Sequence, residues 1–316
     1  MNILFLLVGL ALILAGAHFL TDGAAALAQR FRVPEFIVGL TVVAIGTSMP
    51  ELVVSVLSAL GGQSDMAVGN VVGSNLFNVF VILGVCALIR PLALSGENIR
   101  RDIPVGLAAS VLFFVFASDK LLHLGAVDRI GRAEGIVMLL LYAAFLWYSV
   151  RAAGRRGAPK TADSRPPKPW WLMLGLIAAG LAGLVYGGDL FLHHATVIAR
   201  KLGVSESVIA ITLVAGGTSL PELAASVVSL AKGKAGLALG NVLGSNVANI
   251  LLILGVSATI RPLTMGGITT LDMAMVVLSS FLLFVAAFTF RRKAVDRWEG
   301  AIFLAIYVAY IRYLVR

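Results

Sequence analysis

Two glutamates stand inside long apolar stretches, and each directly follows a proline. Glu51 ends the sequence GTSMPE, and Glu222 ends the sequence GTSLPE. A charged side chain at the centre of a bilayer costs about 2.5–3.5 kcal/mol on insertion scales. A proline within a helix adds to this cost, because it has no N–H to donate. Such a pattern persists only if a cation or a proton neutralises the carboxylates, so it indicates cation chemistry.

The residues before each glutamate supply further oxygen atoms. Pro50 and Pro221 leave the carbonyls four residues earlier, those of Gly46 and Gly217, without their helical donors. Carboxylate, carbonyl and hydroxyl oxygens are hard ligands that suit calcium or sodium. No intramembrane Lys or Arg falls opposite these positions in the pattern, so a mobile cation is the expected partner. The neighbouring hydroxyl groups belong to Thr47, Ser48, Thr218 and Ser219.

A second motif pair, GNVVGSNLFN and GNVLGSNVAN, follows each glutamate. On a helix, Ser74 and Asn78 are four residues apart and share one face, and so do Ser245 and Asn249. These side chains are candidate oxygen ligands, and hydrogen bonding between helices is the alternative role. Glycines at spacing four allow close helix packing, which is the role we expect for Gly69, Gly73, Gly240 and Gly244.

Composition places these motifs in a membrane. The 316 residues are 59% hydrophobic and 13% charged, with mean hydropathy +0.96, whereas soluble domains carry about 25% charged residues. The net charge of +9 does not indicate nucleic-acid binding, because the basic residues gather in short loops between apolar runs. The single cysteine, Cys86, excludes an internal disulfide and a multi-cysteine metal site.

The hydropathy pattern predicts an all-α polytopic membrane protein with ten transmembrane helices. A basic, proline-rich segment at 151–170 separates a five-helix half at 1–150 from a second at 171–316. The expected spans are 2–21, 35–60, 66–89, 103–118, 131–150, 171–192, 204–231, 235–260, 269–290 and 298–315.

The distribution of basic residues predicts the orientation. If the N-terminus is outside, 17 of the 25 Lys and Arg residues fall on one side of the membrane. The positive-inside rule makes that side cytoplasmic. Both termini are therefore expected outside and the linker 151–170 inside, in what we expect to be a prokaryotic plasma (inner) membrane.

The two motif regions, 41–92 and 212–263, are copies of one another. A shift of 171 residues aligns 44–92 with 215–263 without a gap, with 28 identities in 49 positions. Because each half contains five spans, the copies have opposite orientations in the membrane. Inverted repeats with Gly/Pro-interrupted helices are typical of secondary transporters that bind substrate near the midplane.

At these motifs the chain resembles the calcium/cation antiporter superfamily, specifically the sodium/calcium exchanger type. The resemblance implies that Glu51 and Glu222 ligate calcium and also serve sodium, and that the chain is no enzyme and needs no cofactor. It implies that the site is completed by the Thr47, Ser48, Thr218 and Ser219 hydroxyls, by Ser74 and Ser245, and by backbone carbonyls near Ala44 and Ala215. Many relatives, including potassium-dependent exchangers, have an aspartate where this chain has Asn249, which mirrors Asn78 and argues against potassium co-transport.

The resulting hypothesis is potassium-independent exchange of sodium for calcium by alternating access. A calcium/proton antiporter that uses the same glutamate pair is the main alternative. A passive channel with an oxygen-lined site is a second alternative. An intramembrane enzyme is disfavoured, because the sequence contains neither a His-Glu-x-x-His motif nor a serine nucleophile with a base in sight.

Overall fold

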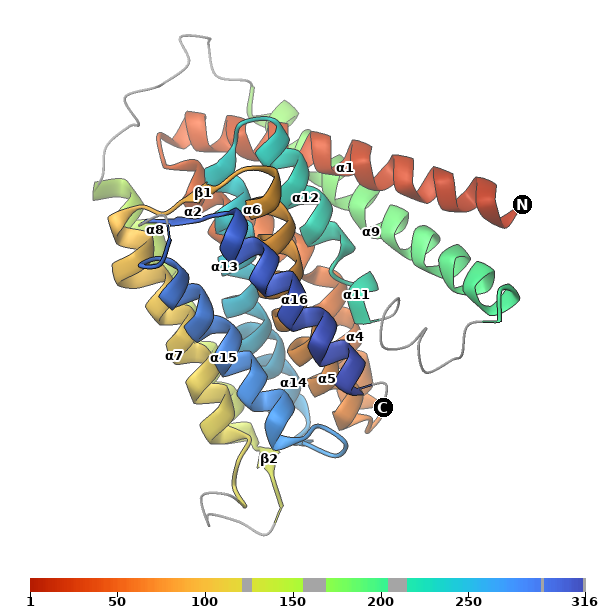
Figure 1. Cartoon of the computed structure of the whole chain (residues 1–316). Coiled ribbons are helices and arrows are strands. Elements are labelled where there is room, and N and C mark those ends of the chain that lie inside the picture. Colours follow the sequence, from red (N-terminus) through yellow and green to blue (C-terminus); the bar gives the residue numbers. More distant parts are fainter. Residues whose placement is uncertain (121–126, 156–168, 204–214, 291–292, 315–316) are drawn as a thin grey trace. The chain divides into compact units, whose positions relative to one another are not determined.

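The computed structural model describes residues 1–120, 127–155, 169–203, 215–290 and 293–314 (Figure 1). The described chain is almost entirely helical, which confirms the predicted all-α class. Its only strands are four two-residue segments that form two antiparallel pairs.

The elements of the first half include α-helices, π-helical segments (η) and two short strands. They are α1 (Asn2–Phe31), α2 (Glu35–Val38), η1 (Gly39–Val43), α3 (Ala44–Thr47), α4 (Met49–Leu60), α5 (Ser64–Leu76), η2 (Phe77–Leu83), α6 (Gly84–Ile89), β1 (Leu92–Ala93), η3 (Asn98–Asp102), α7 (Ile103–Phe116), β2 (Arg129–Ile130) and α8 (Arg132–Arg155).

The second half repeats much of this order. Its elements are α9 (Trp170–Lys201), α11 (Ala215–Gly217), α12 (Leu220–Ala231), α13 (Ala235–Val247), η5 (Ala248–Leu254), α14 (Gly255–Ile260), β3 (Leu263–Thr264), α15 (Thr270–Ala286), β4 (Ala294–Val295) and α16 (Arg297–Leu314). Most of the predicted linker and the start of the seventh predicted span lie outside the described residues.

Each predicted span overlaps helix wherever its residues are described. By length and hydropathy, five described helices are able to cross a membrane, or six if the bent pair 35–60 counts as one span. The count of ten therefore stays a prediction. The first and sixth helices are longer than expected, because α1 continues to Phe31 and α9 to Lys201. Hydropathy predicts the lipid-facing part of a helix, whereas the helix itself ends only where the sequence stops favouring it.

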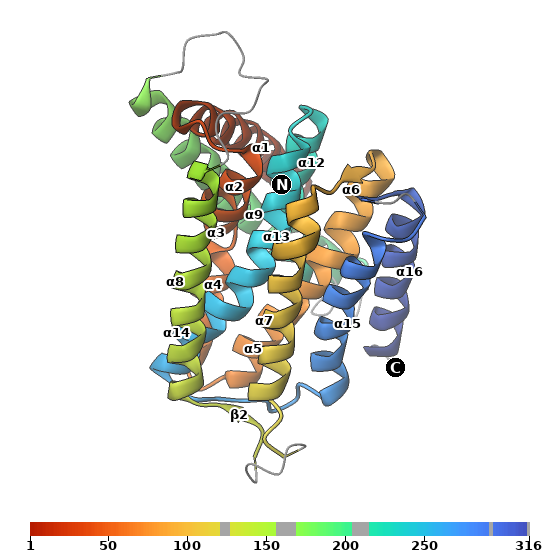
Figure 2. The same cartoon turned by 90° about the vertical axis from the view of Figure 1, so that its left-hand side faces the viewer.

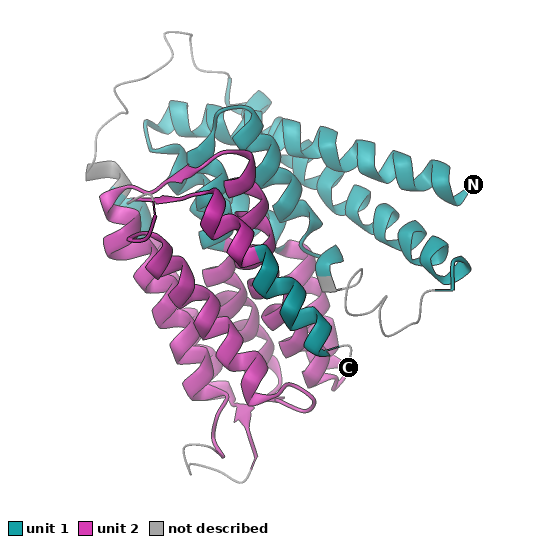
Figure 3. Cartoon of the chain, in the orientation of Figure 1, with its two compact units in different colours: residues 1–48, 148–244, 304–316 teal, residues 49–147, 245–303 magenta. Residues whose placement is uncertain are grey.

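The chain forms two compact units (Figure 3). Unit 1 comprises residues 1–48, 148–244 and 304–316, and unit 2 comprises residues 49–147 and 245–303. Each unit thus takes elements from both halves of the sequence, and the predicted division at 151–170 remains a description of the repeat. In unit 1, α1 runs along α9 (Figure 1) and buries Ala17, Leu20 and Leu184 completely.

The strand pairs show that the repeat is inverted within unit 2. β1 directly follows α6 and pairs with β4, while its repeat counterpart β3 follows α14 and pairs with β2. The two pairs lie at opposite ends of the unit (Figures 1 and 2). The equivalent helices α6 and α14 therefore end at opposite ends of unit 2, as the odd number of spans per half predicts.

Two π-helical segments also repeat. Segments η2 and η5 are related by the same shift of 171 residues, and they contain Asn78 and Asn249. The sequence analysis treated residues 74–78 as regular α-helix, but the helix changes to π-helical hydrogen bonding at Phe77. Isolated π-turns often occur at functional sites. The α-helical spacing that the sequence analysis assumed between Ser74 and Asn78 therefore does not hold.

Close helix packing in unit 1 explains one motif glycine. A Cβ on Gly240 would overlap the carbonyl oxygen of Phe36, a backbone atom of α2. At its repeat counterpart Gly69, in unit 2, the nearest atom to such a Cβ is Cδ1 of Ile268 at 3.3 Å, the movable end of a side chain. The packing role expected for the glycines thus holds strongly at Gly240 and weakly at Gly69.

The substitution Gly240→Ala is expected to destabilise the protein by about 1–3 kcal/mol, the usual cost of overpacking. The matched variant Gly69→Ala should unfold close to the wild-type temperature. Thermal unfolding of both purified proteins in detergent, followed by size-exclusion chromatography, measures the difference. Equal losses of stability in the two variants would contradict this account of the packing.

Candidate ion-binding site

Both glutamates follow an interruption in a helix. The chain leaves α3 at Ser48 and restarts as α4, with a bend of 45° across the break. Ser219 has the same backbone conformation before α12, with φ −89° and ψ 7° against φ −83° and ψ 7° at Ser48. Pro50 and Pro221 are the second residues of the new helices, where a missing N–H costs nothing.

The break places each carboxylate in the first turn of a helix. Glu51 is the third residue of α4 and Glu222 the third residue of α12, and both are at most 1% exposed. Unpaired N–H groups and the helix dipole favour negative charge at this position. The local structure thereby stabilises an ionised carboxylate without a basic side chain.

In unit 1, Glu222 is surrounded by residues from both copies of the repeat. Ser48 donates a hydrogen bond to Glu222 Oε1 at 2.9 Å. The hydroxyl of Thr47 lies 3.1 Å from Asn241 Oδ1, and Asn241 Nδ2 lies 3.3 Å from the backbone oxygen of Glu222. The hydroxyls before the first break are therefore next to the carboxylate after the second one.

In unit 2, Glu51 faces α5. Ser74 donates to Glu51 Oε1 at 3.4 Å, a weak hydrogen bond that brings both predicted ligands together. Asn70 Nδ2, one helical turn earlier, lies 3.2 Å from the backbone oxygen of Glu51. Helix α4 also packs on η5, the segment that carries Asn249. Unit 2 thus combines a glutamate from one copy with an asparagine-bearing segment from the other.

Several buried polar atoms at these positions have no hydrogen-bond partner among the described residues. They are Oε2 of Glu222, Oγ of Ser245, both polar atoms of the Asn78 side chain and Oδ1 of Asn249. Buried polar groups without a partner are costly and rare in folded proteins. Oxygen atoms dominate this set, and oxygen is the ligand type that calcium and sodium require. The donor set therefore fits a hard cation.

The predicted ligand residues fall in both units. Buried side chains are found at Thr47, Ser48, Glu51, Ser74, Asn78, Ser219, Glu222, Ser245 and Asn249, while Thr218 is half-buried. Ala44 is buried, and its carbonyl accepts the backbone N–H of Ser48 at 3.0 Å. Ala215 begins α11, and its side chain lies outside the described set. Joint ligation of one ion by both glutamates stays a prediction.

Sequence reasoning missed four residues that contact the glutamate segments. Asn70 and Asn241 bond the two glutamate backbones, and each also bonds a serine, Ser55 or Ser226, one helical turn after the glutamate. The repeat contained the signal, because all four residues recur at the shift of 171.

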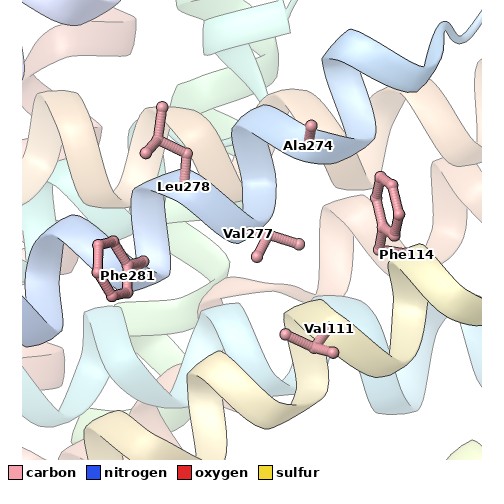
Figure 4. Close-up of a pocket in the computed structure, with 6 residues that line it drawn as sticks. All are labelled: Val111, Phe114, Ala274, Val277, Leu278 and Phe281. Atoms are coloured by element: carbon pink, nitrogen blue, oxygen red, sulfur yellow. The ribbon is translucent and has the colours of Figure 1, made fainter.

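Two other kinds of site are absent from the described residues. No group of three or more His, Cys, Asp or Glu side chains that could hold a metal ion occurs among them. A groove of about 350 Å³ between α7 and α15 in unit 2 (Figure 4) is lined by apolar side chains that offer no oxygen ligand to an ion. These are Val111, Phe114, Ala274, Val277, Leu278 and Phe281.

Comparison with known proteins identifies the family. The profile described as sodium/calcium exchanger protein matches residues 1–151 and 172–316. The chain belongs to the sodium/calcium exchanger family. The resemblance inferred from the motifs is thereby confirmed, as is the prediction that the protein is a transporter and not an enzyme.

Relatives match this exchanger-family protein over most of its length. The sodium/calcium exchanger MaX1 of Methanosarcina acetivorans is 32% identical over 341 residues, covering 98% of this chain and 97% of MaX1. The inner membrane protein YrbG of Escherichia coli is 36% identical over 265 residues, covering 81% and 79%. A structure of the sodium-calcium exchanger NCX_Mj, soaked with sodium and calcium, matches with a TM-score of 0.83 and 32% identity, covering 98% and 97%.

These matches establish an integral membrane protein of a family that exchanges cations without a cofactor. The expected ions of the family, calcium and sodium, agree with the oxygen-rich donor set found around each glutamate. The ion that drives transport in this exchanger-family protein, and its independence of potassium, are addressed under the proposed function.

The substitution Ser48→Ala is expected to raise the half-saturating calcium concentration for transport at least about tenfold. A hydrogen bond to a charged group contributes about 1.5–3 kcal/mol, and 1.4 kcal/mol corresponds to a factor of ten. Radiolabelled calcium uptake into proteoliposomes measures this concentration. Ser58→Ala removes a buried hydroxyl of α4 outside both clusters and should leave it unchanged. An unchanged value for Ser48→Ala would show that Ser48 does not act on the ion.

Proposed function

We propose that this protein is a secondary antiporter that exchanges sodium for calcium by alternating access, independently of potassium. The observation that carries the proposal is the pair of buried glutamates, each in the first turn of a helix restarted within the membrane and each contacted by hydroxyl and amide groups. The relative MaX1, which is named a sodium/calcium exchanger and matches nearly the whole chain, supports the same assignment.

The proposed mechanism follows from charge balance. Glu51 and Glu222 together carry two negative charges, which one calcium ion or two sodium ions neutralise. Calcium and sodium compete for the same oxygen atoms, so a full set of both is never bound. Without a bound ion, the site would carry two uncompensated charges through the bilayer, at several kcal/mol. The protein therefore changes its orientation when loaded and not when empty, which couples the two ion flows.

Calcium/proton antiport is the alternative that shares this site. Protons would neutralise the two carboxylates in place of sodium, and the glutamates alone are compatible with both driving ions. The surrounding hydroxyl and amide oxygens favour sodium, because a proton on a carboxylate needs one acceptor whereas a sodium ion needs several oxygen ligands.

Independence of potassium is proposed from the residue at position 249. Asn249 is neutral, as is its counterpart Asn78, so the site contains two acidic residues and not three. An additional monovalent cation would leave the loaded site with an uncompensated positive charge. We therefore infer that calcium alone occupies the site in the calcium-bound state.

The proposed location is a prokaryotic plasma (inner) membrane, with both termini outside and the linker 151–170 in the cytoplasm. The excess of basic residues on one side supports this orientation. The similarity to the inner membrane protein YrbG supports the location.

The driving ion is tested by loading proteoliposomes with sodium chloride and diluting them into sodium-free medium that contains radiolabelled calcium. Calcium uptake should depend on the outward sodium gradient and should not change when external potassium is replaced by choline. A pH gradient without sodium should drive no uptake above that of protein-free vesicles. Uptake that follows the pH gradient would establish the proton-coupled alternative, and uptake with no counter-ion would establish a channel.

The carboxylates are tested by Glu51→Gln and Glu222→Gln in the same assay. Each variant should lose sodium-driven calcium uptake down to the background of protein-free vesicles, because one remaining charge cannot balance a divalent ion. Glu35→Gln, which removes a half-exposed carboxylate that pairs with Lys234 at 2.6 Å, is the control and should retain uptake. Full exchange in either of the first two variants would refute the site.

A further inference from the structure

Asn70 connects the two helices that build the Glu51 site. Its Nδ2 lies 3.2 Å from the backbone oxygen of Glu51 and 3.0 Å from Oγ of Ser55, both on α4. Ser55 in turn donates its hydroxyl hydrogen to the carbonyl of Ala67 on α5, at 3.2 Å. The result is a polar cross-link between α4 and α5 that includes the glutamate backbone but not its carboxylate.

Asn241 makes the same pair of contacts in the other unit. Its Nδ2 lies 3.3 Å from the backbone oxygen of Glu222 and 3.0 Å from Oγ of Ser226. Asn241 is fully buried, and its Oδ1 accepts from the hydroxyl of Thr47 at 3.1 Å. The repeated geometry occurs in two separately packed units, so it follows from the motif and not from one local environment.

The chemistry of this position requires an amide. The carbonyl oxygen of Glu51 can only accept, and the hydroxyl of Ser55 has already donated to Ala67. The residue between them must therefore offer two hydrogens from one atom, which the NH₂ group of asparagine does. An aspartate of the same shape would place an acceptor against two acceptors. A serine has only one hydrogen and is too short to reach both atoms.

We propose that Asn70 and Asn241 are positioning residues for ion exchange. Each fixes the main chain of its glutamate against the neighbouring helix, so that the carboxylate meets the ion in one orientation. In unit 2 the consequence is visible, because Ser74 lies one turn after Asn70 on the same face of α5 and reaches the Glu51 carboxylate. This inference rests on the proposed function, since it assigns a role to residues that act through the glutamates.

The predicted effect is on affinity. Asn70→Leu, which keeps the approximate shape but removes both donors, should raise the half-saturating calcium concentration by about three- to tenfold. Sodium-driven uptake at saturating calcium should stay within about twofold of wild type, because the carboxylates remain. A purely structural role would lower the amount of folded protein and the maximal rate without changing the half-saturating concentration.

Asn75→Leu is the matched control. Asn75 lies on the same helix and is equally buried, but its Nδ2 donates to the carbonyl of Val71, one turn earlier on α5 itself. Its half-saturating calcium concentration should equal that of the wild type. If Asn70→Leu does not fold, Asn70→Ser takes its place. The same shift in both position-75 and position-70 variants, or no shift in either, would overturn the proposal.

Calcium binding separates this proposal from the transport hypothesis. Calcium-dependent thermal stabilisation of the purified protein in detergent should show the same three- to tenfold weakening for Asn70→Leu relative to Asn75→Leu. A wild-type protein that binds calcium but does not exchange it for sodium would refute the proposed function while leaving this comparison valid. A wild-type protein that neither binds nor transports calcium would refute both.

Discussion

The site depends on keeping a carboxylate ionised where no basic side chain accompanies it. The chain meets this requirement locally, by ending one helix and restarting another directly before each glutamate. The restarted helix directs its unpaired N–H groups and the positive end of its dipole toward the carboxylate. These contributions are small beside the cost of an isolated charge in a bilayer. They stabilise the carboxylate partially, and a bound cation must provide the rest.

The repeat determines how these parts are distributed. In unit 1, the hydroxyl of Ser48 from the first copy bonds the carboxylate of Glu222 from the second copy. In unit 2, Ser74 bonds Glu51, and both belong to the first copy. The two glutamates therefore have different donors although their sequences are nearly identical. An inverted repeat allows this difference, because the chain can pair equivalent segments with one another as well as with themselves.

Much of the site could be predicted from the sequence, because its costs are visible there. A glutamate after a proline in an apolar run has few explanations, and its recurrence at a fixed shift removes most of them. The π-helical segments could not be predicted, because the change from i+4 to i+5 hydrogen bonding leaves hydropathy unaltered. The contacts of Asn70 and Asn241 were missed for a related reason. The partner of a buried amide depends on the rotation and register of two helices, which the spacing of residues within one helix does not determine.

The small number of charges in the site favours exchange over tight retention of one ion. Calcium sites that bind strongly use several carboxylates, and affinity rises with the charge count. Here only Glu51 and Glu222 are acidic, and Asn78, Asn249 and the serines contribute neutral oxygens. Neutral oxygens satisfy the coordination of calcium and sodium alike without adding a charge that would bias the site toward the divalent ion. A site that must release calcium to sodium on each cycle needs this balance, and the replacement of a carboxylate by Asn249 provides it.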